Sequence, residues 1–106
     1  MAIAAKAGKP IDIGKMISRK PGVRGGRPCI AGTGVSVMRV ASWHNQGWIP
    51  EEIATRVGIS LAEVHAALAY YFDNREEIDG DFKRDEDLAE SLRHKFPSKL
   101  KEKLGG

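Results

Sequence analysis

The chain has 106 residues and a net charge of +3, and 42% of its residues are hydrophobic while 29% are charged. This length excludes two full domains, and this balance excludes both a disordered chain and a membrane protein. Because no segment has the length and hydropathy of a membrane span or of a secretory signal, we expect a single cytoplasmic domain with short tails.

The first third of the chain predicts a basic tail followed by two short strands. Residues 1–10 are mostly Ala, Lys and Gly without apolar periodicity, which is typical of a flexible basic arm. Apolar residues alternate over 11–17 and predict a strand that ends at the Lys-Pro-Gly turn of residues 20–22. Residues 29–30 predict the second strand, in which Cys29, the single cysteine, is interpreted as a small packing residue. Two strands are marginal alone, so we expect helices or a second subunit to cover them.

Three helices are predicted from signals for helix starts and ends. Apolar residues take helical spacing after Ser36. Pro50 suits the first turn of a helix, and Gly58 suits its end. Ser60 and Glu63 form a capping box, in which each side chain binds a free backbone N–H at the start of the next helix. The predicted helices run over 37–47, 50–57 and 61–74.

The acidic segment that follows predicts a break and a separate extension. Asp79-Gly80-Asp81 is a turn-like sequence, which divides the chain into an arm (1–10), a core (11–78) and an amphipathic extension (79–106). Apolar residues recur every four positions in the extension and predict two short helices separated at Pro97. The expected fold is mainly α with a short N-terminal β-hairpin (α+β), in which a three-helix helix-turn-helix core carries a C-terminal helical extension.

The second and third predicted helices carry a helix-turn-helix pattern. Such a motif needs a small residue, a turn glycine and apolar anchors, and the chain supplies Ala54, Gly58, Ile59 and Val64. A plain helical hairpin is the alternative interpretation. The outward side of the third helix is poor in side chains that read bases, and it suits a dimer or partner interface instead; its residues are Ala62, Glu63, His65, Ala66 and Ala69.

The charges are separated along the chain. Residues 1–48 carry eight basic side chains against one acidic one, residues 49–92 carry four against twelve, and residues 93–106 carry five against one. Such blocks indicate an anionic partner for the first segment, although a merely solvated surface is the alternative. We therefore expect salt-sensitive contacts with DNA phosphates from the basic residues of the hairpin region and first helix, namely Lys15, Arg19, Lys20, Arg24, Arg27 and Arg39.

The sequence offers no catalytic constellation. His44, His65 and His94 lie in separate predicted elements, and no nucleophile stands beside a base. The glycines of 25–26 and 32–34 are not followed by the Lys-Ser/Thr pair of a phosphate-binding loop. We expect a binding protein that is not an enzyme and takes no metal, cofactor or small-molecule substrate.

Three runs of residues carry a resemblance to a known family: Gly26-Arg27-Pro28-Cys29-Ile30-Ala31-Gly32-Thr33, then Gly47 with Glu51-Glu52-Ile53, then Leu61 and Val64 with Ala67-Leu68-Ala69-Tyr70-Tyr71. Through them, residues 17–78 resemble the domain of unknown function 433 family, a helix-turn-helix group related to VapB-type antitoxins. Members of that family usually carry an arginine after the Gly-Thr pair, where this chain has Gly34. Arg27 is the nearest candidate to replace that arginine.

This resemblance implies a homodimeric antitoxin of a type II toxin–antitoxin pair, which binds operator DNA and a PIN-like ribonuclease. Such a nuclease holds Mg²⁺ on carboxylates, so a cationic segment could block it. We expect the extension to do so, with apolar anchors at Leu88, Leu92, Phe96 and Leu100 and cations at Arg93, Lys95 and Lys99. The alternative is an oligomeric protein-interaction module with a helix-turn-helix fold that does not bind DNA.

Overall fold

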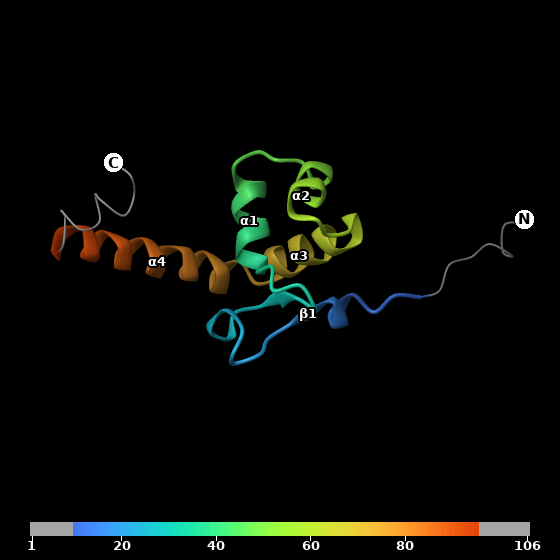
Figure 1. Cartoon of the computed structure of the whole chain (residues 1–106), viewed down its shortest axis with the longest axis horizontal. Helices are drawn as coiled ribbons and strands as arrows, with labels where there is room; N and C mark the ends of the chain where they lie inside the picture. The colour runs from blue at the N-terminus through green and yellow to red at the C-terminus, as the bar shows by residue number, and fades with distance from the viewer. Residues whose placement is uncertain (1–9, 96–106) are drawn as a thin grey trace, which may run out of the picture.

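The computed structural model describes residues 10–95, which form four α-helices and a two-stranded antiparallel hairpin (Figure 1). The mainly helical α+β fold predicted from the sequence is confirmed. Residues 1–9 of the predicted arm, the helix expected beyond Pro97, and Phe96, Lys99 and Leu100 lie outside the described residues. The elements in chain order are the 3-10 helix η2 (Ile13–Met16), β1 (Ile17–Ser18), the 3-10 turn η3 (Arg24–Gly26), β2 (Cys29–Ile30), α1 (Val37–Asn45), α2 (Pro50–Val57), α3 (Leu61–Asp73) and α4 (Arg75–Lys95).

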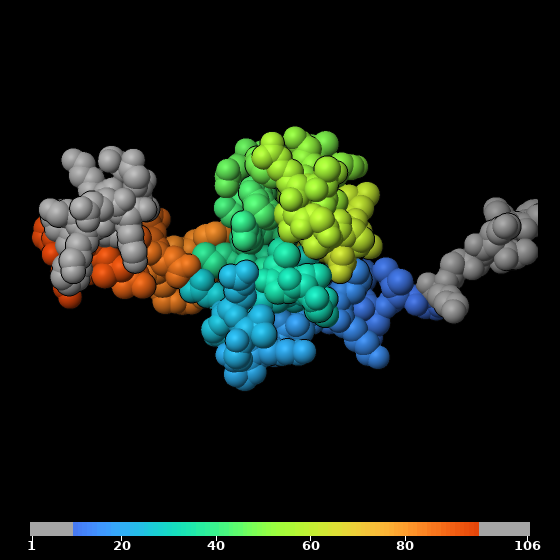
Figure 2. Space-filling model, in the orientation of Figure 1, coloured from blue at the N-terminus to red at the C-terminus, as the bar shows by residue number. Residues whose placement is uncertain are grey.

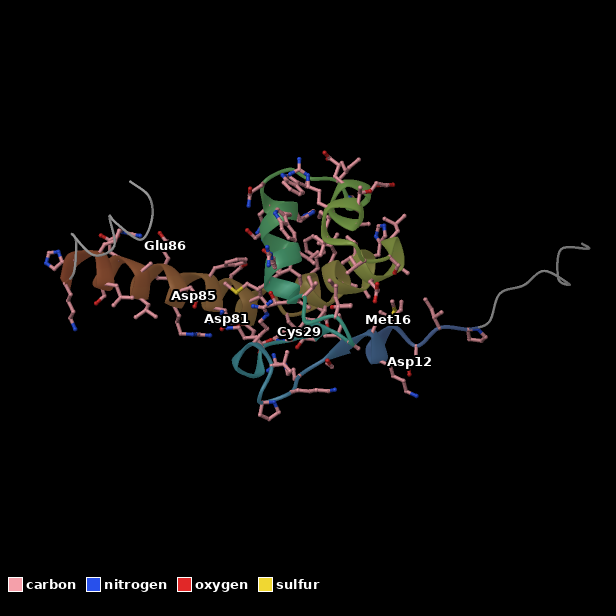
Figure 3. The ribbon with its side chains drawn as sticks, viewed as in Figure 1. Asp12, Met16, Cys29, Asp81, Asp85 and Glu86 are labelled. Carbon is pink, nitrogen blue, oxygen red and sulfur yellow. The ribbon has the colours of Figure 1, made fainter. Side chains whose placement is uncertain are left out.

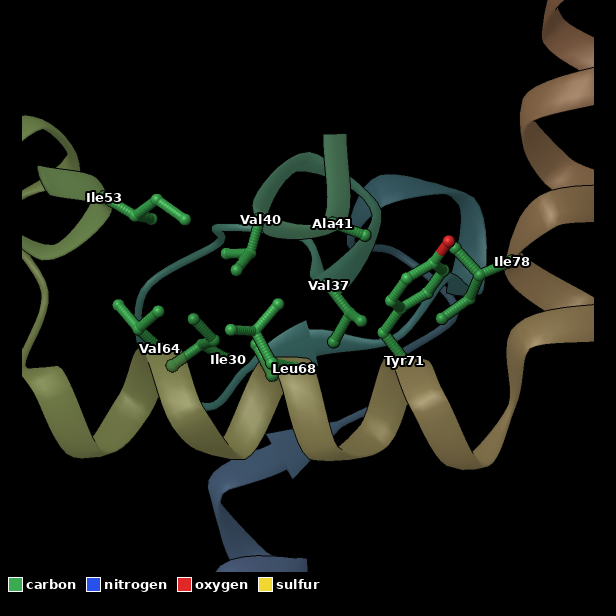
Figure 4. Close-up of a cluster of buried hydrophobic side chains, with 10 residues drawn as sticks. Ile30, Val37, Val40, Ala41, Ile53, Val64, Leu68, Tyr71 and Ile78 are labelled. Atoms are coloured by element: carbon green, nitrogen blue, oxygen red, sulfur yellow. The ribbon is translucent and has the colours of Figure 1, made fainter. Parts of the chain in front are cut away.

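Helix α3 is the centre of the fold. Helices α1 and α2 pack on one side of it, and the hairpin with η2 packs on the other (Figure 1). The core between these layers is apolar, with Val40 of α1, Ile53 of α2 and Val64 of α3 all fully buried (Figure 4). Burying one such side chain stabilises the fold by about 1.5–3 kcal/mol. The core therefore holds α1–α3 and the hairpin together as one unit.

Local signals set the starts of the helices. The Ser36 hydroxyl accepts a hydrogen bond from the backbone N–H of Arg39 at 3.1 Å at the start of α1. The predicted capping box of α3 is confirmed: the Ser60 hydroxyl accepts from the Glu63 N–H at 3.0 Å, and the Glu63 carboxylate accepts from the Ser60 N–H at 2.8 Å. Each bond satisfies a backbone N–H that has no partner within the helix.

Two glycines predict stability changes of opposite sign. Gly58 ends α2 with φ +78°, so Gly58→Ala places a Cβ in the left-handed region and lowers the free energy of unfolding by about 1 kcal/mol. Gly80 lies inside α4, where a Cβ meets the Arg84 Nη1 at an ordinary 3.5 Å. Gly80→Ala therefore raises the free energy of unfolding by about 0.5–1 kcal/mol. Urea denaturation measures the free energy of unfolding of both variants. Changes of the same sign would contradict the backbone conformations assigned to Gly58 and Gly80.

The predicted first strand is partly wrong. Residues 13–16 form the 3-10 helix η2, and only Ile17 and Ser18 pair with the second strand, opposite Ile30 and Cys29. The chain turns early, because the backbone N–H of residue 15 donates to the carbonyl of residue 12 at 3.0 Å. The apolar residues over 11–13 are exposed and do not belong to the pleated face that their alternation indicated.

The break predicted at Asp79-Gly80-Asp81 is wrong, because α4 runs through these residues without interruption. Of the two predicted short helices, the one before Pro97 is the end of a single helix of 21 residues, Arg75–Lys95. The chain changes direction earlier, at Asn74, whose φ of −132° is not helical. The Asn74 side-chain amide donates to the Tyr70 carbonyl at 2.9 Å and closes the end of α3. Asp81 is buried and ion-paired with Arg84 in the next turn, so this part of α4 is held by side-chain contacts.

Candidate functional site

The six basic residues predicted to contact DNA divide into three groups. Lys15 and Lys20 are exposed side chains of the hairpin region. Arg19 and Arg27 form ion pairs with α4. Arg24 and Arg39 line one hollow in the surface. The structure therefore brings together only two of the six.

Arg27 joins the hairpin to α4. Its two terminal nitrogens donate to the carboxylate of Asp85 at 2.8 and 2.9 Å, and its Nε lies 3.8 Å from a carboxylate oxygen of Asp81. Figure 3 shows Asp81 and Asp85 along the part of α4 that approaches the hairpin. The hydrogen bonds to Asp85 raise the pKa of the Arg27 guanidinium, and the same bonds lower the pKa of Asp85. The charge of Arg27 is therefore balanced within the chain.

Arg19 makes a second link to α4. It is ion-paired with Glu77, and its Nη2 donates to the Tyr70 hydroxyl at 3.1 Å. The hydrogen bond to Glu77 is the main cause of the raised pKa of Arg19. Both links connect residues more than fifty positions apart and fix the direction in which α4 leaves the core.

The Arg27–Asp85 pair predicts a pH-dependent stability. Asp85→Asn lowers the free energy of unfolding at neutral pH by about 0.5–1 kcal/mol, because the pair is half exposed and bidentate. Since the pKa of Asp85 is lowered in the folded chain, its contribution is complete above the ordinary aspartate pKa and is lost as the pH falls through the lowered value. Urea unfolding of both proteins at neutral pH and at about pH 2 tests this. A difference that persists in acid would contradict it.

Helix α4 carries one side-chain face from the core into solvent. Ile78 and Asp81 are buried and Phe82 packs against the core. At 3.6 residues per turn, Leu88 and Leu92 continue the same face. They are 60% and 39% exposed, and Figure 2 shows this end of α4 projecting beyond the packed elements. We call these two residues the leucine stripe.

The predicted cations of the extension flank this stripe where the structure describes them. Arg93 is exposed and ion-paired with Glu90 at 2.8 Å, one turn earlier in α4. Lys95 is exposed at the last described position. The helix therefore presents apolar and basic side chains together near its end.

Arg24 and Arg39 meet a third arginine, Arg56, around a hollow of about 610 Å³. The Arg39 guanidinium lies 5.1 Å from the ring centroid of Trp43, and the Arg56 guanidinium lies 4.3 Å from that of Trp48. The two indole rings stack on each other, with centroids 5.5 Å apart. We call this site the arginine hollow.

Sequence reasoning missed Arg56, because it lies in the segment whose summed charge is strongly negative. The pair Arg39 and Trp43 is visible in the sequence at i, i+4 spacing on one helix face. The pair of Arg56 with Trp48 depends on the turn between α1 and α2, and no local pattern indicates it.

Arg24, and not Arg27, is the arginine beside Gly34. The Arg24 Nε donates to the Gly34 carbonyl at 3.0 Å, and both residues line the arginine hollow. Arg24 has a φ of +49° and is followed by two glycines that also have positive φ. This tight turn directs the side chain of Arg24 back toward residue 34. Arg27 is bonded to Asp85 and does not replace a side chain at Gly34.

The outward face of α3 differs from the prediction at one position. Ala66 is only 3% exposed, because η2 and β1 pack on that side of the helix, where Ala66 lines a hollow with Ile17. Ala62, His65 and Ala69 are exposed as expected. The exposed part of α3 still lacks an Arg, Lys, Asn or Gln that could bind a base edge.

The candidate sites of the described residues are built from arginine and leucine side chains. Between residues 10 and 95 no cluster of three or more His, Cys, Asp or Glu side chains could hold a metal ion. No helix in that range combines the length and hydropathy that a bilayer span requires. Cys29 is buried, which raises the pKa of its thiol and confirms the interpretation of Cys29 as a packing residue.

Fold and surfaces define a small α+β domain in which three helices pack on a hairpin and a fourth helix projects. The family model described as protein of unknown function (DUF433) matches residues 17–71, more than half of the chain, and the protein belongs to this family. The crystal structure of a DUF433 member protein from Anabaena variabilis ATCC 29413 is similar to this chain. It has 31% sequence identity and a TM-score of 0.59, over 63% of this chain and 67% of that one. A comparison with curated proteins gives no match.

Proposed function

We propose that this protein is an antitoxin of a type II toxin–antitoxin pair, which acts by binding and not by catalysis. It neutralises a PIN-like ribonuclease through its C-terminal extension. The observation that carries the proposal is the leucine stripe, because Leu88 and Leu92 are 60% and 39% exposed and neither belongs to the hydrophobic core of the described residues. An amphipathic helix that continues past its own core is suited to lie in the apolar groove of a partner.

The charges next to the stripe fit the proposed partner. A PIN-like nuclease holds Mg²⁺ on a cluster of carboxylates, which attracts cations. Arg93 and Lys95 follow the leucines on the same helix, and Lys99 follows in the sequence. Arg93 would exchange its pair with Glu90 for a carboxylate of the partner. This exchange costs little, because an exposed ion pair contributes only about 0–1 kcal/mol.

Co-purification tests the proposal directly. The full chain is co-expressed with the product of the adjacent reading frame, and the complex is isolated through a tag on that partner. We expect a stable complex, and we expect ribonuclease activity only when the partner is freed from this chain. If no neighbouring product forms a complex, the antitoxin assignment is wrong.

The second part of the proposal is autoregulation by a homodimer that binds its own promoter, with α2 and α3 as the helix-turn-helix pair. The exposed Lys15 and Lys20, with the arginine hollow, supply charge for phosphate contacts. The competing function is an oligomeric interaction module that does not bind DNA, favoured by Glu63 and the alanines of α3. Preferential retention of upstream DNA over a random duplex at physiological salt supports autoregulation. Equal retention of the two duplexes contradicts it, and retention of neither supports the module.

A further inference from the structure

The arginines of the chain fall into two classes. Five of the eight form ion pairs with carboxylates of the same chain, namely Arg19, Arg27, Arg75, Arg84 and Arg93. Within residues 10–95 the other three, Arg24, Arg39 and Arg56, form none. All three line the arginine hollow, to which no described carboxylate contributes. The unbalanced guanidinium charge of the domain is therefore concentrated at one site.

The three guanidinium groups are held in place by neutral groups. Arg24 is fixed by its hydrogen bond to the Gly34 carbonyl, and this bond uses only its Nε. Arg39 and Arg56 lie over indole rings, an arrangement that orients a guanidinium without using its N–H donors. Arg56 also borders Glu51 and Glu52 on its other side but makes no ion pair with either in the described structure. The terminal N–H groups of the hollow therefore remain available to a ligand.

We propose that the arginine hollow binds a phosphate group. Guanidinium groups match phosphate oxygens in planar, two-point hydrogen bonds, and three of them compensate the charge of a phosphodiester or a polyphosphate. A volume of about 610 Å³ admits such a group together with its neighbouring atoms. With DNA as the source of the phosphate, this site deepens the autoregulation part of the proposed function and rests on it, but the site would stand if no partner toxin were found.

Two sources could deliver the phosphate: the backbone of a DNA duplex or a free polyphosphate. The wild-type full chain is titrated at low salt with a short random duplex and, separately, with sodium pyrophosphate. Both tryptophans of the chain line the hollow, so tryptophan emission reports binding there without any substitution. We expect a saturable change with at least one probe, and the probe that gives it identifies the source. No change with either probe overturns the proposal.

Variants that remove one positive charge test which arginines bind the phosphate-containing probe. With the probe that binds, Arg39→Gln and Arg56→Gln are each expected to weaken binding about tenfold, the loss of one charge-assisted contact. If the duplex binds, each also lowers the slope of log affinity against log salt by about 1. Arg75→Gln is the matched control, which removes the same charge from an ion-paired arginine of α4 and changes affinity less than about twofold. Far-UV circular dichroism checks that every variant is folded.

Equal affinities of the hollow variants and the Arg75→Gln control would overturn the proposal, since general charge alone would then explain binding. The test is independent of the antitoxin assignment, because the tryptophan titration uses this chain alone. Its result therefore stands whether or not a toxin co-purifies with the chain.

Discussion

Ile78→Ala is expected to lower the free energy of unfolding by about 2–5 kcal/mol. Ile78 is fully buried, and Figure 4 shows its side chain against Tyr71 of α3. Removal of three carbons there loses their burial and leaves a cavity, because the surrounding helices relax only partly. The same substitution loosens the first turns of α4, which Ile78 holds on the core. Urea denaturation followed by far-UV circular dichroism measures the change.

Leu88→Ala is the control for Ile78→Ala, because it also shortens an apolar side chain of α4. Leu88 is 60% exposed, so its substitution should change the free energy of unfolding by less than about 0.5 kcal/mol. A large difference between the two variants supports a helix that is anchored at one end and free at the other. Similarly large losses of unfolding free energy in both variants would mean that Leu88 is packed in solution. Losses below about 1 kcal/mol in both variants would mean that α4 is not part of the core.

The sequence predicts α1–α3 well because their boundaries depend on local chemistry. Ser36, Pro50, Gly58 and Ser60 each act on backbone groups within a few residues, and such effects are readable in order along the chain. The course of α4 is harder to predict from the sequence. Gly80 has an ordinary helical conformation, although Asp79 and Asp81 on either side of it make the sequence look like a turn. A glycine inside a helix costs only about 1 kcal/mol, and the tertiary contacts around it outweigh this cost.

The same distinction applies to the candidate sites. The sequence places Arg24, Arg27 and Arg39 together as basic residues, and only the fold separates Arg27, which meets Asp85 across 58 positions. The leucine stripe was predictable, because its spacing along one helix is local. The arginine hollow required α1 and α2 to bring Arg39 and Arg56 together.

Replacing both leucines of the stripe, Leu88→Ser/Leu92→Ser, is expected to weaken the complex with the proposed toxin by about 30- to 1,000-fold, which corresponds to about 2–4 kcal/mol. Both side chains are exposed in the free chain, so their loss removes apolar surface that only a partner would bury. The free energy of unfolding of the isolated chain should change little. Competition titration of the purified complex with wild-type and variant chains measures the affinity.

Lys83→Ser/Asp87→Ser is the matched control on the opposite face of α4. This pair has the same i, i+4 spacing, is 76% and 65% exposed, and forms a single ion pair, so the double substitution leaves the net charge unchanged. Because helical periodicity directs it away from the leucine stripe, we expect its affinity for the toxin to stay within about threefold of wild type. If the control weakens the complex as much as the leucine variant, the toxin senses the helicity or charge of α4 and not its apolar face. If neither variant weakens the complex, the leucine stripe does not contact the toxin, and binding must come from residues after Lys95 or from the core.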